Sequence, residues 1–126
     1  MKLLLALSIV MLLAGCTGST VTDTTSTAAS PGGATSRKVD LYDNSFEDGN
    51  LTLTKGATIT YRNEGQHGHT VTVHWVGEPL TTYRLDKTLQ PGETVDFTFK
   101  DAGTYHVWCR FHGMMTSGMA TVVKVA

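Results

Sequence analysis

The chain has 126 residues, of which 40% are hydrophobic and 17% charged, and its formal net charge at pH 7 is -1. This length suits one small globular domain. The near-neutral balance gives no electrostatic basis for binding nucleic acid or an anionic membrane surface, so we expect no nucleic-acid partner. The two cysteines, Cys16 and Cys109, could form one disulfide, but Cys16 lies at the end of a targeting segment.

The N-terminus has the features of a secretory signal peptide. Lys2 supplies a positive charge, and the apolar run over residues 3–13 is too short to span a bilayer. The run ends at Leu13-Ala14-Gly15-Cys16, which resembles the lipobox of bacterial and archaeal lipoproteins. We therefore expect residues 1–15 to be a lipoprotein signal peptide and Cys16 to carry lipid. The alternatives are an ordinary signal peptide with an incidental cysteine, or a buried helix.

Residues 16–36 are interpreted as the lipidated cysteine and a linker. Beyond Cys16 the segment is almost entirely Thr, Ser, Ala and Gly, with Pro31 near its end. Such a composition buries too little apolar surface to offset its ordering entropy and behaves as a flexible chain. A linker of about twenty residues reaches about 25 Å, which would let an anchored domain meet partners at the membrane surface.

The remaining residues, 37–126, show the pattern of an all-β domain. Alternating runs separated by turn residues cover 39–42, 50–54, 58–62, 70–76, 94–99, 104–109 and 120–125. Short strands at this spacing, without a helical period, predict a β-sandwich. The stretch 77–89 is the least regular, and it holds a short strand at 82–85 or crosses between the sheets.

Soft metal ligands gather near the C-terminus. Cys109 ends a strand-like run, His112 follows three residues later, and Met114, Met115 and Met119 precede the last strand. Thiolate, imidazole and thioether groups suit copper, whereas calcium and magnesium prefer oxygen ligands.

A second imidazole is expected from upstream. His69 stands where the polar loop 63–69 enters a strand, so the sheet can fix its side chain. His67 lies in the loop and is expected to be solvated. His74 falls on the strand face opposite the apolar residues and is expected to point outward, and His106 faces away from the side on which Cys109 lies.

Several motifs in order resemble the cupredoxin family, the small blue copper proteins such as plastocyanin, amicyanin and halocyanin. The matching stretches are 51–63, Gly68–Val73, Pro91-Gly92-Glu93, Gly103-Thr104-Tyr105, and Cys109–His112 followed by Gly118-Met119. The resemblance covers roughly residues 37–126. It implies a cupredoxin-like Greek-key β-sandwich of about seven to eight strands.

The resemblance also implies the ligands of one type 1 copper ion. His69, Cys109 and His112 would be the strong ligands, and a methionine the weak axial one. Met119 is favoured, because Gly-Met often stands just before the last strand in this family. Met115 is the alternative, at the amicyanin spacing. Phe111 departs from the proline that many relatives have before the histidine.

Two further features are expected around such a site. The backbone N–H of Thr70 could reach the Cys109 sulfur, a kind of contact that tunes metal sites. Phe111, Met114 and neighbouring residues would form an apolar rim around the exposed edge of His112, through which an electron could pass.

We therefore expect a single-electron carrier, anchored to the cell membrane outside the cytoplasm, in the periplasm or at the outer cell surface. By analogy its partners would be redox proteins of a respiratory or denitrifying chain, and we expect a monomer. No enzymatic activity is expected, because four ligands leave copper no open position. The alternatives are a copper-binding or copper-trafficking lipoprotein, a zinc-binding domain, and an adhesin-like sandwich with a buried cysteine.

Overall fold

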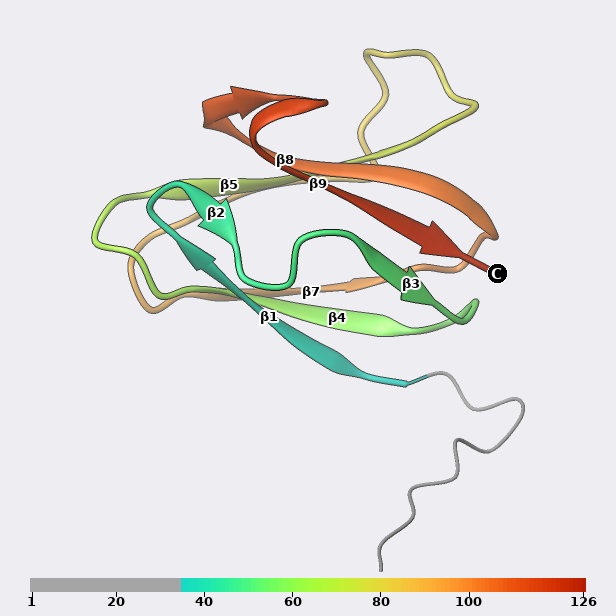
Figure 1. The fold of residues 1–126 in the computed structure, drawn as a ribbon, viewed down its shortest axis with the longest axis horizontal. Helices are drawn as coiled ribbons and strands as arrows, with labels where there is room; N and C mark the ends of the chain where they lie inside the picture. The colour runs from blue at the N-terminus through green and yellow to red at the C-terminus, as the bar shows by residue number, and fades with distance from the viewer. Residues whose placement is uncertain (1–34) are drawn as a thin grey trace, which may run out of the picture.

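The computed structural model describes residues 35–126, and every regular element in this part of the chain is a β-strand (Figure 1). The strands are β1 (Arg37–Tyr42), β2 (Ser45–Phe46), β3 (Leu51–Leu53), β4 (Thr58–Asn63), β5 (His69–Trp75), β6 (Leu85–Leu89), β7 (Thr94–Thr98), β8 (Gly103–Met114) and β9 (Ser117–Val125). The prediction of an all-β domain is confirmed.

The strands form two stacked sheets (Figure 1). One has the order β2-β1-β4-β7 and the other the order β3-β9-β8-β5-β6. Both sheets are mixed, because β1 runs parallel to β4 and β3 runs parallel to β9. The sandwich has nine strands where about seven to eight were predicted. The unpredicted strand β2 has only two residues, too few to produce an alternating pattern.

Two stretches differ from the elements that the sequence suggested. For 77–89 the sequence left open a strand at 82–85 or a crossing between the sheets, whereas β6 begins only at Leu85 and pairs with β5 in the same sheet. The central residues of β6 are exposed at the sheet edge, so this strand lacks the apolar alternation that would reveal it. The run predicted at 104–109 continues to Met114, and β9 begins at Ser117, so the methionine-rich segment is a β-hairpin instead of a long loop.

The core lies between the two sheets and follows the period-2 alternation of the strands. Valines, leucines and isoleucine from both sheets are buried in it, and Phe97, Phe99 and Tyr105 pack edge to face. The centroid of the Phe99 ring lies 4.8 Å from that of Phe97 and 4.9 Å from that of Tyr105. The contact between Phe99 and Tyr105 joins β8 to the opposite sheet. Burying each such side chain contributes about 1.5–3 kcal/mol. The result is a stiff scaffold for the ends of β5 and β8.

The predicted signal peptide, the lipidation site Cys16 and nearly all of the predicted linker lie outside the described residues. Within residues 35–126, no helix is long and apolar enough to cross a bilayer.

Candidate metal centre

Three side chains from two strands meet at one end of the five-stranded sheet. His69 is the first residue of β5, whereas Cys109 and His112 belong to β8. The Cys109 Sγ lies 3.7 Å from His69 Nδ1 and 3.5 Å from His112 Nδ1, and the two Nδ1 atoms are 3.1 Å apart. Their potential ligand atoms all lie within 4.8 Å of one another, which makes this a candidate metal centre.

The three residues differ in their exposure to solvent. His69 and Cys109 are completely buried, whereas His112 is exposed. A metal held here would be shielded on two sides and linked to the surface through the His112 ring.

Thr70 holds Cys109 and the residue after it. The Thr70 backbone N–H donates to the Cys109 Sγ at 3.3 Å, as the sequence predicted. The Thr70 hydroxyl oxygen accepts a 2.7 Å hydrogen bond from the backbone N–H of Arg110. The side chain and the backbone of one residue therefore fix the position of the thiol against β5.

Asn63, a buried residue at the end of β4, holds the loop that delivers His69. Its Nδ2 donates to the carbonyl oxygens of His67 at 2.7 Å and Leu89 at 3.0 Å. Its Oδ1 accepts from the Gly65 N–H at 2.9 Å. These bonds tie the loop to both sheets, which restricts where His69 can lie.

Asp43 is a neighbour of the centre that sequence reasoning missed. Its Oδ1 accepts from the backbone N–H groups of Gln66 at 2.9 Å and His67 at 3.2 Å, and lies 3.3 Å from His69 Nε2. Desolvation acts to raise the pKa of Asp43, but hydrogen bonds from His69, Gln66 and His67 outweigh it and lower the pKa to about 2. The carboxylate is therefore charged at neutral pH.

The three methionines occupy different environments. Met119 is buried and belongs to the core cluster, Met115 is half-buried in the β8–β9 turn, and Met114 is 74% exposed. Met119 follows Gly118, which pairs with Gly113 just after His112. The burial of Met119 agrees with an interior role, and its assignment as axial ligand stays a prediction.

The other histidines do not belong to the His69–Cys109–His112 cluster. The His67 side chain is 72% exposed, as predicted. His74 points away from the core but is buried, not solvated, because the loop after β5 covers it and its Nδ1 lies 2.9 Å from the Thr82 carbonyl oxygen. His106 pairs with His74 across β5 and β8. Burial, together with His74, lowers the pKa of His106.

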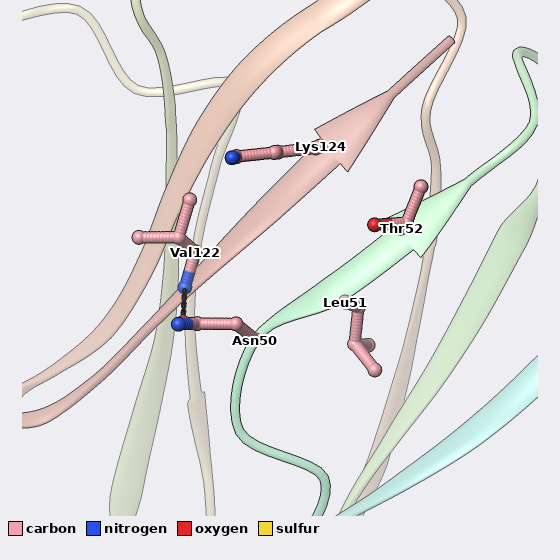
Figure 2. A pocket seen from close by; sticks show the side chains of 5 residues that line it. All are labelled: Asn50, Leu51, Thr52, Val122 and Lys124. Atoms are coloured by element: carbon pink, nitrogen blue, oxygen red, sulfur yellow. Dashed lines mark hydrogen bonds between the residues drawn. The ribbon is translucent and has the colours of Figure 1, made fainter.

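A surface hollow of about 360 Å³ lies elsewhere, along β3 and β9 (Figure 2). Its lining residues are Asn50, Leu51, Thr52, Val122 and Lys124. The Asn50 side chain closes one side by accepting a 2.9 Å hydrogen bond from the Val122 N–H. None of His69, Cys109 and His112 lines this hollow, so it is separate from the candidate centre.

The chemistry of the donor set fits copper. One thiolate and two imidazoles, with a methionine sulfur nearby in sequence, form the set expected of a type 1 copper site. The predicted cofactor, one type 1 copper ion, matches this arrangement. His69, Cys109 and His112 are the described residues that would hold it.

Comparisons with known proteins agree with this fold. A purple cupredoxin from Nitrosopumilus maritimus is 19% identical, with a TM-score of 0.57, over 71% of this chain and 99% of the other. Auracyanin from the photosynthetic bacterium Roseiflexus castenholzii is 21% identical, with a TM-score of 0.59, over 75% and 99%. An amicyanin mutant in its reduced Cu(I) form is 27% identical, with a TM-score of 0.59, over 72% and 82%.

The sequence itself matches the family model described as the cupredoxin-like domain over residues 5–122. This match covers most of the chain, and it includes the two strands that carry the His-Cys-His cluster. The protein is therefore a member of the cupredoxin-like domain family.

Proposed function

We propose that this protein is a blue copper electron carrier, in which His69, Cys109 and His112 hold the metal with Met119 as the axial ligand. The observation that carries the proposal is the combination of two buried ligands with one exposed ligand on a rigid sandwich. When bound, copper supplies a one-electron couple between Cu(II) and Cu(I). Met115 is the alternative axial ligand.

The protein's own contribution is to keep the ligands still while the electron moves. Cys109 is fixed by the Thr70 N–H, and His69 lies at the end of a loop fastened by Asn63. Ligands held in this way need little rearrangement between the two oxidation states. Four ligands also leave no position for a substrate, so we propose a carrier and not an enzyme.

The route to a partner is proposed to run through His112. This residue is exposed, and the neighbouring Phe111 and Met114 are 57% and 74% exposed. The Phe111 and His112 ring centroids lie 6.5 Å apart. An apolar rim around the exposed edge of His112 allows a redox partner to approach closely, because water is readily displaced from between two apolar surfaces.

The proposed location is the outer side of the cell membrane, in the periplasm or at the outer cell surface. The support is the lipobox-like sequence ending at Cys16 and the Thr/Ser/Gly-rich composition of residues 17–36. A lipid on Cys16 would keep the carrier beside membrane-bound redox proteins, as a monomer on a tether. Mass analysis of Cys16 in the purified protein would test the anchor.

The test of function is the visible and EPR spectrum after adding Cu(II). A blue carrier gives an intense absorption from the Cys109 thiolate and a narrow copper hyperfine splitting. A colourless protein that binds only Cu(I) would point to copper trafficking instead. A preference for zinc would indicate a structural metal site.

A further inference from the structure

The second nitrogen of the His69 ring lies beside a carboxylate oxygen. The Nδ1 atom faces the Cys109 Sγ and the His112 Nδ1, so it is the atom that would bind the metal. The Nε2 atom lies 3.3 Å from the Asp43 Oδ1, at the long end of N–H···O hydrogen bonds. A neutral imidazole that ligates through Nδ1 carries its proton on Nε2. His69 is therefore the donor and the Asp43 carboxylate the acceptor.

The carboxylate is held in place independently of His69. Asp43 stands in the turn between β1 and β2, in the four-stranded sheet, whereas His69 begins β5 in the other sheet. Backbone N–H groups of Gln66 and His67 donate to the same Asp43 oxygen. The loop before His69 therefore wraps around a fixed anion, and the His69–Asp43 contact joins the two sheets beside the metal centre.

Gly65 leaves the space that this contact needs. A Cβ at this position would lie 2.4 Å from the Asp43 Oδ1 and 3.0 Å from the His69 Nε2. Gly65 is not among the glycines with positive φ, so the backbone conformation alone does not demand glycine. The reason for glycine here is steric: any side chain would push the carboxylate away from the imidazole.

We propose that Asp43 is a positioning residue for the copper centre: it fixes the tautomer and orientation of His69 and favours Cu(II) over Cu(I). A carboxylate that accepts from a ligating histidine raises the basicity of that ligand. Its negative charge also stabilises the more positive metal state. The inference rests on the proposed function, and it adds a group that sets the reduction potential.

The first test compares Asp43→Asn with Asp48→Asn. Both changes remove one carboxylate charge, but Asp48 pairs with Arg37, and no hydrogen bond joins it to His69 in the described part of the chain. We expect Asp43→Asn to weaken Cu(II) binding by about tenfold or more. A tenfold shift of the Cu(II)/Cu(I) equilibrium raises the midpoint potential by about 59 mV. Asp48→Asn is expected to leave the potential unchanged, and equal potentials in the two variants would overturn the assignment.

The second test disturbs the contact without substituting either partner. Gly65→Ala is expected to raise the potential in the same direction as Asp43→Asn. Gly68→Ala is the matched control, because a Cβ there meets only Gln90 atoms at 3.5–3.9 Å. An unchanged potential in a folded Gly65→Ala protein would contradict the proposal.

A readout that does not depend on electron transfer separates this inference from the proposed function. In the diamagnetic zinc-loaded protein, NMR should show a slowly exchanging His69 Nε2–H that Asp43→Ala, which removes the acceptor, makes fast. Fast exchange in the unchanged protein would overturn the role of Asp43, even if Asp43→Ala did not fold. The absence of a blue Cu(II) site would overturn the electron-carrier function instead, and the zinc measurement would still decide the role of Asp43.

Discussion

At the residue scale, Thr70 supports the Cys109 thiol through its backbone and the Arg110 N–H through its hydroxyl group. Thr70→Val would leave that N–H without its acceptor in a part-buried position. An unsatisfied buried donor costs about 1–3 kcal/mol, so we expect the free energy of unfolding to fall by that amount. Urea unfolding measures it. Thr70→Ser, which keeps the hydroxyl, should retain the stability, and a fully stable Thr70→Val protein would contradict this role.

The axial ligand is a second prediction at this scale. Met119 is buried, whereas Met115 is only half-buried in the hairpin turn. The axial ligand adjusts the electronic structure of a type 1 copper site. We therefore expect Met119→Gln to change the copper hyperfine splitting and lower the potential, and Met115→Gln to change neither. The opposite pattern in EPR spectra would assign the axial position to Met115.

The residues around the centre show how far sequence reasoning reaches. His69, Cys109 and His112 were singled out because their types and order resemble a known ligand pattern, and the structure brings them together. Asp43 was missed because it lies 26 residues before His69, in a turn between two strands of the other sheet. In the sequence it reads as an ordinary turn residue, since Asp and Asn are common in turns. Only tertiary structure reveals its proximity to the imidazole.

At the element scale, the pairing of β5 with β8 fixes the geometry of the ligands. The register runs from Thr72 opposite Trp108 to Trp75 opposite Tyr105. Because a slip of one residue would turn every side chain to the other face, this register keeps Cys109 on the His69 side. The β8–β9 pairing is irregular between Trp108 and Gly113, the segment that contains Cys109 and His112. Single-sequence patterns do not specify such irregular pairing, which explains why the hairpin was predicted as a loop.

The same strand pair predicts a pH dependence of stability. The His106 Nδ1 is buried and has no hydrogen-bond partner among the described residues, and burial and His74 lower the His106 pKa below 6.5. The unfolded chain therefore binds a proton at His106 more readily than the folded protein does. The contribution of His106 to stability is therefore fully present well above pH 6.5 and is lost as the pH falls through and below this value.

Urea midpoints at about pH 7.5 and about pH 5.5 measure this effect. The midpoint should be lower at the acidic pH, and His106→Gln should reduce the difference. If the urea midpoint changed with pH equally in the unchanged protein and in His106→Gln, His106 would not be the cause of the pH dependence.

At the scale of the whole molecule, the proposed route for electrons lies at the surface around His112, and other exposed apolar residues serve as controls. Met114 is 74% exposed next to the centre, and Leu80 is 71% exposed in the loop between β5 and β6. Electron self-exchange requires two copies of the protein to meet at the apolar rim around His112. Met114→Glu would place a negative charge on this rim in both copies. We expect electron self-exchange, measured by NMR line broadening, to slow by about tenfold without a change in the visible spectrum.

Leu80→Glu adds the same charge to another exposed apolar position and should have little effect on self-exchange. Equal slowing by the two variants would mean that the rim around His112 is not the route for electrons.

An electron carrier of this kind must keep one copper ion through both oxidation states. A redox titration of the copper-loaded protein, followed by the thiolate absorption and by the bound copper content, tests it most directly. We expect a reversible one-electron transition with full recovery of the blue colour and no loss of metal. Release of copper on reduction, or colour that does not return on reoxidation, would contradict an electron carrier and indicate a protein that delivers copper.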